Sequence, residues 1–539
     1  MDDGMDLPDD AKEETAAPGG PTAETTAVPR GALQARFPKQ AIVVVHGMGE
    51  QRPMDTIKAF VKSVWQDDPV ATANGLRNPN EVWSRPDERL DSLELRRITT
   101  RESIPSPDVF DRGVRSDFFE LYWADLTAGT PWEDFLGWLR YLLLRDPFSN
   151  VPAQVMLAWC LLWVITIIFS VLGILSLIPA NTTIYGWDVP DFGSWRWLVL
   201  ILLGAGGSLL HRLIQQTFGR VVRYTRATPN NIAARKAVRE RGLQLLETLH
   251  NDGQYGRVIL VGHSLGSILA YELLAFFWAR HAESRRVRES TPGFGALKEL
   301  EEVGALLDAE PNDDALLLRW RNAQRNLRQQ LAARPAPSPA KPVNERWIIS
   351  DFVTLGSPLT HAQFLMAAGK EDLNARKMSR EMPTSPPVRE LLDPLNAQAA
   401  AEAGMPINSA SRDYQLFSFP WRDPDRTWEM HHAAVFAAVR WTNISDRSRL
   451  IFQGDLISGP LRPVFGPGVI DIDLKTVRGQ AHHFTHTEYW DSRATASQLQ
   501  VLRQAVNLLD RPPEEIWAGS KEIMRLCENR PGLSPTGHL

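Results

Sequence analysis

The sequence has few cysteines and almost no excess of charge. Its two cysteines among 539 residues, Cys160 and Cys527, cannot build a disulfide framework, which favours a reducing compartment. The 59 basic and 64 acidic residues leave a net charge of −5, so nothing in the charge balance indicates a nucleic-acid partner. Residues 1–35 contain almost no large apolar side chains, which predicts a disordered tail. They also lack the basic and apolar regions of a signal peptide.

A strand–turn–helix pattern surrounds one serine. Val258-Ile-Leu-Val261 predicts a short buried strand, Gly262-His-Ser-Leu-Gly266 follows, and Ser267-Ile-Leu-Ala-Tyr-Glu-Leu-Leu274 predicts a helix. This is the context of a nucleophile elbow, in which the flanking glycines admit a sharp turn and the serine is presented at its tip. We therefore expect Ser264 to be a nucleophile. The alternative is a tight turn with an incidental serine.

A second strand ends in a glycine-rich loop. Gln40-Ala-Ile-Val-Val-Val45 predicts a buried strand, and His46-Gly-Met-Gly49 follows it. Backbone N–H groups in such a loop can point at an anion. With a nucleophilic serine nearby, one of them would join the N–H of the residue after the nucleophile to form an oxyanion hole. We place these donors at Met48 and Leu265. The alternative is an ordinary turn with a core histidine.

A serine hydroxyl needs a base, and the base needs an orienting acid. The chain order Ser, Asp, His is satisfied by Ser264, then Asp455 or Asp446, then a histidine cluster. Asp455 is preferred because glycines flank its loop, and Asp446 is the alternative acid. For either aspartate, a simple Asx turn is the competing interpretation.

The histidine cluster contains His482, His483 and His486. His486 is the preferred base because the aromatic pair Tyr489-Trp490 could anchor it, and His483 is the alternative. No acidic or cysteine ligand is spaced with these histidines as a metal site requires, so we expect neither a metal nor a cofactor. His263, inside the elbow, is expected to pack locally rather than to act as the base.

The chain contains two long apolar runs. Residues 155–178 form an uncharged run of about 24 residues, long enough to span a bilayer, and a second span covers about 195–214. Gly204-Ala-Gly-Gly-Ser208 would allow close helix contact, and Trp187, Trp195 and Trp197 suit a membrane interface. We predict a transmembrane hairpin. The alternative is a pair of buried core helices.

The charges that flank the two spans predict their orientation. The arginines outside the hairpin are Arg140, Arg145, Arg212, Arg220, Arg223 and Arg226, whereas the connecting loop contains Asp188, Asp191 and only Arg196. By the positive-inside rule, both ends and all the catalytic motifs face the cytoplasm. We therefore expect an integral protein of the cytoplasmic membrane.

Several segments would build one elaborated domain. Trp347-Ile-Ile-Ser-Asp-Phe-Val-Thr-Leu355 predicts another strand, which the Gly356-Ser-Pro358 turn ends, and helices are predicted over about 230–250 and 494–509. Residues 281–345 are charged and helix-prone and end in a proline-rich stretch, which predicts a helical insertion rather than a strand unit. Two interpretations are open for it: a lid over the active site, or a solvated surface helix. We divide the chain into a tail (1–35), three segments of one α/β domain with the candidate catalytic residues (36–145, 217–280 and 346–510), the hairpin (146–216), the helical insertion (281–345) and a C-terminal tail (511–539).

The motifs together resemble the α/β-hydrolase superfamily, in particular its lipase-like branch. Gly262-His-Ser-Leu-Gly266 and Thr354-Leu-Gly-Ser-Pro358 are typical of that branch. The remaining motifs look like a set found in bacterial membrane-associated serine hydrolases of uncharacterised function: His46-Gly-Met-Gly-Glu-Gln51, Glu120-Leu-Tyr-Trp-Ala-Asp125, Asp455-Leu-Ile-Ser-Gly-Pro-Leu461 and His486-Thr-Glu-Tyr-Trp490. The resemblance covers residues 38–280 and 346–510 without the hairpin. It implies a mostly parallel sheet with helices on both faces, a Ser-Asp-His triad and an oxyanion hole.

The sequence therefore predicts a membrane-anchored serine hydrolase that cleaves a small-molecule or lipid ester. Two other functions are compatible with the same sequence. One is a non-catalytic membrane scaffold, which would have no need of an intact Ser, Asp and His set. The other is an acyltransferase, which differs only in the acceptor of the acyl group. The oligomeric state is not indicated by any pattern.

Overall fold

The apolar segments predicted as strands lie side by side in the middle of one sheet. β1 (Lys39–Val45), β7 (Tyr255–His263) and β9 (Ile349–Leu355) contain almost only buried residues, as parallel strands covered on both faces must. The computed structural model describes residues 39–47, 52–90, 92, 94–106, 109–127, 229–335, 343–408, 412–446, 454–455, 457–479, 485–491 and 493–517, with Tyr224 and scattered positions between 156 and 188.

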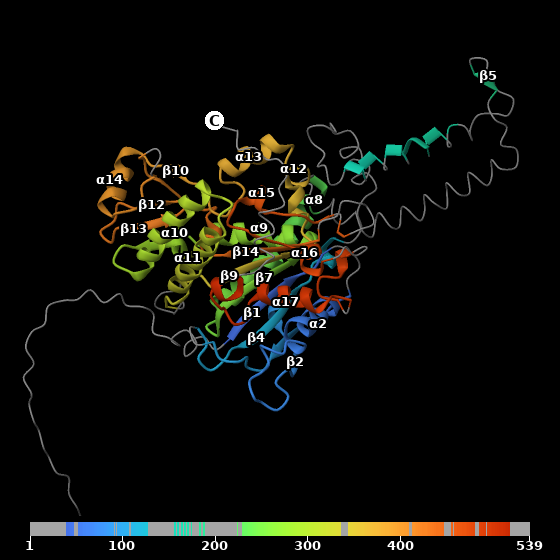
Figure 1. The fold of residues 1–539 in the computed structure, drawn as a ribbon, viewed down its shortest axis with the longest axis horizontal. Coiled ribbons are helices and arrows are strands. Elements are labelled where there is room, and N and C mark those ends of the chain that lie inside the picture. The colour runs from blue at the N-terminus through green and yellow to red at the C-terminus, as the bar shows by residue number, and fades with distance from the viewer. Residues whose placement is uncertain are drawn as a thin grey trace, which may run out of the picture.

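The sheet has eight strands in the order β15-β14-β9-β7-β1-β4-β3-β2 (Figure 1). From β15 to β4 all neighbours run parallel, whereas β3 pairs antiparallel with β4, and β2 with β3. The mostly parallel sheet confirms the predicted α/β class. The antiparallel edge was not among the predicted strands. The other strands of the sheet are β2 (Val82–Pro86), β3 (Arg96–Thr100), β4 (Arg115–Leu121), β14 (Arg440–Ser445) and β15 (Ile470–Asp473).

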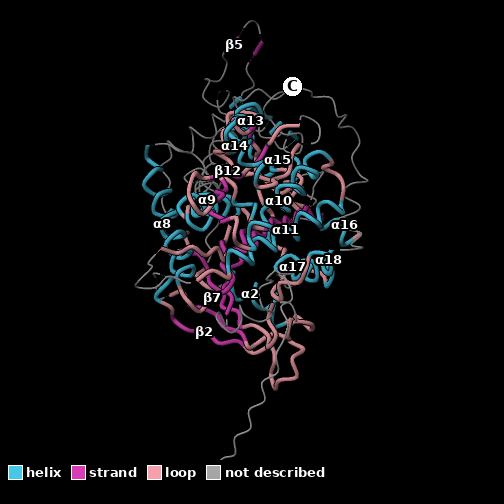
Figure 2. The backbone as a smooth tube through the Cα atoms, turned by 90° about the vertical axis from the view of Figure 1, so that its left-hand side faces the viewer, coloured by secondary structure: helices cyan, strands magenta, loops and turns pink. Residues whose placement is uncertain are grey.

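Helices cover both faces of the sheet. α8 (Pro229–Asn251) and α9 (Leu265–Arg280) lie on one side, and α16 (Leu474–Arg478) and α17 (Ala496–Val506) lie on the other (Figure 2). α8 and α17 confirm the helices predicted near 230–250 and 494–509. Other helices in the described residues are α2 (Asp55–Val61), α12 (Ala362–Leu365), α13 (Lys370–Met378), α14 (Pro394–Glu402), α15 (Arg462–Phe465), α18 (Pro513–Trp517) and the short η1 (Lys62–Gln66), η2 (Glu88–Leu90), η3 (Ala124–Thr127), η4 (Glu283–Arg285), η5 (Pro358–His361), η6 (Val435–Ala437) and η7 (Thr485–Thr487).

The predicted helical insertion contains two long helices, α10 (Pro292–Ala309) and α11 (Asp314–Ala332), which pack against each other. Their inner faces are fully buried, as at Leu300, Trp320 and Leu327, and α11 also contacts β9 and β14. The expectation that this insertion contains no strand is wrong for β8 (Arg286–Arg288). β8 pairs with β13 (Thr427–Met430), which also pairs with β12 (Ser418–Pro420). A strand of three residues is too short to show an alternation of apolar and polar side chains, and its partner lies far away in the sequence. The lid role stays a prediction.

The predicted membrane spans fall largely outside the described residues. Of this region the structure describes two short paired strands, β5 (Thr183–Ile184) and β6 (Trp187–Asp188), and scattered positions before them. Within the described part of the chain, none of the helices combines the length and the apolar character that crossing a bilayer requires. The hairpin therefore stays a prediction. A further short pair of strands, β10 (Glu390–Leu391) and β11 (Gln415–Leu416), lies elsewhere.

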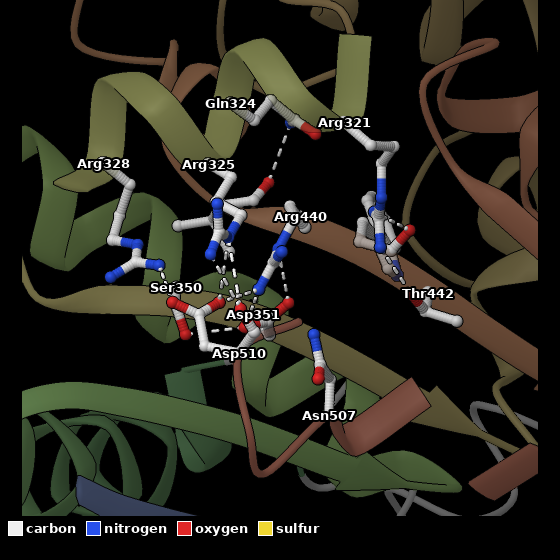
Figure 3. Close-up of polar contacts among 12 residues, drawn as sticks. Arg321, Gln324, Arg325, Arg328, Ser350, Asp351, Arg440, Thr442, Asn507 and Asp510 are labelled. Atoms are coloured by element: carbon white, nitrogen blue, oxygen red, sulfur yellow. Dashed lines mark hydrogen bonds and ion pairs between the residues drawn. The ribbon is translucent and has the colours of Figure 1, made fainter. Parts of the chain in front are cut away.

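A buried network of arginines and aspartates joins distant segments at the amino-terminal ends of the central strands (Figure 3). Arg440, at the start of β14, donates to Asp351 in β9 at 2.8 and 2.9 Å and to Asp510 at 2.8 Å. Arg328 of α11 also donates to the Asp510 carboxylate, and Arg257 of β7 donates to Asp351 at 2.5 Å. The side chains of Arg440, Asp351 and Asp510 are at most 4% exposed. The network thus ties the insertion and the segment after α17 to the sheet.

Candidate active site

Ser264 lies at the turn between β7 and α9, as the G-x-S-x-G pattern predicts. Its backbone has φ 50° and ψ −130°, a conformation that a residue with a side chain rarely adopts. The turn is held by its neighbours, because the Ser264 N–H donates to the Leu355 carbonyl at 2.9 Å. The Ser264 carbonyl accepts from the Ser267 hydroxyl at 2.6 Å. The surrounding structure therefore stabilises a strained residue at the carboxyl end of the sheet.

The flanking glycines are required by close packing at this turn. A Cβ on Gly266 would lie 2.4 Å from the carbonyl oxygens of both Val45 and His46, at the end of β1. A Cβ on Gly262 would lie 2.6 Å from the Cα of Ser267. Both distances are too short for any side chain. The two glycines thus let α9 start directly against the neighbouring strand.

The structure brings the preferred base to the serine. His486, in η7, lies with its Nε2 2.8 Å from the Ser264 hydroxyl oxygen, although 222 residues separate the two in sequence. The His486 Nδ1 lies 2.9 Å from the Asp455 Oδ2. Because the carboxylate only accepts, Nδ1 donates to it, and Nε2 is then free to accept from the serine hydroxyl. These contacts form the Ser–His–Asp arrangement in which a serine can be deprotonated as it attacks.

Asp455 is buried and its carboxylate is held by several donors. Oδ2 accepts from the Tyr489 hydroxyl at 2.8 Å, and Oδ1 accepts from the Ile457 N–H at 2.9 Å. Burial alone raises the pKa of Asp455, but the interactions with His486 and these two donors outweigh burial and hold the pKa below its usual value. Asp455 is therefore ionised at neutral pH, as an acid that orients a histidine must be.

A glycine at the end of β9 makes room for this acid. Gly356 has φ +59°, and a Cβ there would lie 2.7 Å from the Tyr489 ring and 3.0 Å from the Asp455 Oδ2. The Gly356-Ser-Pro358 turn therefore does more than end a strand. Because Gly356 has no side chain, Asp455 and Tyr489 can approach the end of β9, next to the strand that leads to Ser264.

The alternative acid, Asp446, has different partners. Its Oδ2 accepts from Arg478 at 2.5 Å and from the Thr485 hydroxyl at 2.5 Å. Its backbone carbonyl accepts from the Asp455 N–H at 2.8 Å. Asp446 therefore links the acid loop to the residue just before His486, and Asp455 is the aspartate that contacts the base. The alternative base, His483, lies outside the described residues.

Of the two expected oxyanion donors, only one can be placed. Leu265 is the first residue of α9 and is buried beside Ser264. Met48 lies outside the described residues, but Gly47 before it is so near that a Cβ on it would lie 2.7 Å from the Ser264 Cβ. His46 shapes this strand end: its Nε2 accepts from the Trp123 N–H at 3.2 Å and its Nδ1 donates to the Gly47 carbonyl at 2.8 Å. The β1 loop therefore reaches the serine.

Tyr489 and Trp490, the aromatic pair expected to anchor His486, contact the two residues that hydrogen-bond to it. Tyr489 donates to the acid, and Trp490 packs edge-on against His263, with ring centroids 4.7 Å apart. The bond from Tyr489 to Asp455 was not predicted. A tyrosine three residues after the base was its only trace in the sequence.

Among the described residues, no group of three or more histidine, cysteine, aspartate or glutamate side chains converges where a metal ion could bind. His482 lies outside that part of the chain, so the expectation that no metal is used stays untested.

Comparison with known proteins adds no relative: no family model, curated protein sequence or solved structure matches the chain. The fold and the site geometry therefore carry the functional interpretation alone. They define an α/β protein with a mostly parallel eight-stranded sheet and a hydrogen-bonded Ser, His and Asp set at the carboxyl ends of its strands.

Proposed function

We propose that this chain is a membrane-anchored serine hydrolase of the α/β-hydrolase superfamily that cleaves a carboxylic ester. The observation that carries the proposal is the relay from Ser264 to His486 at 2.8 Å and from His486 to Asp455 at 2.9 Å, on a strained strand–helix turn. A non-catalytic scaffold would gain nothing from a strained backbone at Ser264 or from the buried carboxylate of Asp455 near it. Strain of this kind is typical of active sites.

The mechanism follows from the geometry. His486 Nε2 removes the proton from Ser264 as the hydroxyl oxygen bonds to the ester carbonyl carbon, and Asp455 stabilises the imidazolium that forms. The N–H groups of Leu265 and Met48 bind the oxygen that becomes negative. The ester C–O bond then breaks, and His486 returns the proton to the leaving alkoxide. Water, deprotonated by His486, then attacks the acyl carbon; the bond to the Ser264 oxygen breaks, His486 returns the proton to that oxygen, and the carboxylic acid leaves.

The hydrolytic activity is tested with a fluorophosphonate, which bonds covalently to an activated serine and releases fluoride. The detergent-solubilised full chain should label, and the Ser264→Ala variant should not. Ser290→Ala is the matched control, because Ser290 is exposed between β8 and α10 and should leave labelling unchanged. Equal labelling of the Ser264→Ala variant, or no labelling of the unmodified chain, would contradict a serine hydrolase and favour a scaffold.

A lipid ester is the proposed substrate class because of the two apolar runs. The described side chains of Leu157, Ile167 and Ile174 in the first run are 51%, 54% and 61% exposed, which is costly in water and favourable in lipid. The flanking arginines favour a catalytic domain on the cytoplasmic face. The chain should stay with membranes after washing in alkaline carbonate. Release into the supernatant would contradict the membrane anchor and leave the hydrolase proposal standing.

A further inference from the structure

His263, which directly precedes the nucleophile, contacts the backbone of the base. Its Nε2 lies 2.9 Å from the main-chain carbonyl oxygen of His486. A carbonyl oxygen only accepts, so this nitrogen carries the proton and donates it. The nucleophile's neighbour and the base are thus joined by one hydrogen bond across 223 residues of sequence.

The His263 ring is held rigidly enough to act as a fixed donor. The ring packs edge-on against Trp490, at 84° and 4.7 Å between centroids. The ring of His486 lies 5.2 Å away, and a Cβ on Gly47 would approach Nδ1 to 3.1 Å. The ring therefore has neighbours on these sides, and its Nε2 faces the carbonyl oxygen of His486. A side chain in a fixed rotamer can hold a catalytic group within the few tenths of an ångström that the chemistry needs.

The geometry points to His263 as a positioning residue of the proposed hydrolase, one that sets the Ser264–His486 distance by fixing the main chain of the base. This inference rests on the proposed function. Ser264 and His263 are adjacent in the chain. A hydrogen bond from His263 to His486 therefore fixes the main chain of the base relative to the turn that carries the nucleophile. Asp455 fixes the ring of His486 from the other side, at Nδ1.

A neutral donor suits this position. Burial first, and then the neighbouring His486, lower the pKa of His263 to about 3. His263 therefore stays uncharged while His486 gains and loses its proton. A lysine or arginine could donate the same bond, but its fixed charge would oppose the imidazolium that forms during acylation.

The inference is tested with two substitutions at one position. His263→Phe keeps a ring against Trp490 but has no donor, whereas His263→Gln places an amide N–H close to the position of Nε2. We expect fluorophosphonate labelling to be 10- to 100-fold slower in His263→Phe, at a scale typical of a misplaced catalytic group, and to recover to within about 5-fold of the unmodified chain in His263→Gln. With a short-chain ester, kcat should fall and KM should change little.

Thermal unfolding separates positioning from folding. If His263→Phe fails to fold, His263→Leu, which also lacks a donor, replaces it in the comparison with His263→Gln. Labelling of His263→Phe at the unmodified rate, or equal losses in the Phe and Gln variants, would overturn the positioning role and leave the hydrolase intact. Failure of the unmodified chain to label would instead refute the proposed function, and the role of His263 with it.

Discussion

Replacing Asp510 with alanine removes one of the two carboxylates of the buried network at the amino-terminal ends of the strands (Figure 3). The variant loses the bonds from Arg440 and Arg328 to the carboxylate, whereas the bonds from Arg325 to the Asp510 carbonyl, at 3.0 and 3.2 Å, can remain. Two charge-assisted hydrogen bonds contribute about 1.5–3 kcal/mol each. Arg440 and Arg328, whose side chains are buried, would then lack this counter-charge without gaining contact with water.

The free energy of unfolding should therefore fall by about 3–5 kcal/mol, the range for removing one partner of a buried ion pair. In a chain of this size the Tm should fall by only about 3–5 °C, because the entropy of unfolding grows with chain length. Asp425→Ala is the matched control, because Asp425 pairs with Arg288 at 3.4 Å and both side chains are more than half exposed. A surface pair of this kind contributes about 0–1 kcal/mol. Urea midpoints of the two variants give the comparison.

The pH dependence provides a second measurement of the same network. Burial raises the pKa of Asp510 and Asp351, but the surrounding arginines outweigh it and hold both pKa values well below the usual range. A lowered pKa in the folded state stabilises the fold above the unfolded pKa of about 4, and this stabilisation is lost as the pH falls below it. The variant lacks one of these two carboxylates, so the unmodified chain should lose about 1 kcal/mol more stability between pH 5 and pH 3 than Asp510→Ala. Equal stability losses in Asp510→Ala and Asp425→Ala at pH 7 would refute this reasoning.

Two further predictions concern the acid. Asp455→Asn should slow fluorophosphonate labelling by about 10³- to 10⁴-fold, because a neutral amide cannot stabilise the imidazolium; Asp446→Asn, whose side chain holds Arg478 and Thr485, should cost far less in rate and show its effect in the Tm. A larger rate loss in Asp446→Asn would reverse the assignment. Tyr489→Phe, which removes one donor from Asp455, should slow labelling by about 3- to 10-fold at a Tm within a few degrees of the unmodified chain; an unchanged rate would show that the remaining donors suffice.

Local patterns predicted much of the fold because they record what each segment needs from its own neighbours. Continuous apolar runs predicted β1, β7 and β9, and a helical period predicted α8. The strands β2, β3 and β8 were missed. β8 has only three residues and pairs with the distant β13, whereas β2 and β3 pair with each other near the edge of the sheet. Because neither β2 nor β3 is buried throughout, neither contains the continuous apolar run that marks the central strands.

In the candidate site, too, the sequence predicted one part and left another open. The chain order of serine, acid and histidine left two aspartates open, and the choice of Asp455 rested on glycines in its loop. The structure distinguishes them through contacts: Asp455 meets the ring of His486, and Asp446 meets Thr485 and Arg478. Both residues are aspartates that lie between the serine and the histidines in the chain, and both are buried. Neither residue type nor chain order therefore distinguishes them.

The sequence by itself determined the elbow. Gly262 is needed for a local steric reason, the close approach of Ser267, and the pattern of two glycines around Ser264, after a buried strand and before a helix, is visible in the sequence; the contact of Gly266 with the end of β1 comes from the packing of the sheet. Only the tertiary structure decided what the elbow faces. The contacts of Ser264 and His263 with His486 join residues 222 and 223 apart, and they exist because β7, β9 and β14 run parallel and bring their carboxyl ends to one edge. Such pairings depend on how whole strands pack, which no single segment encodes.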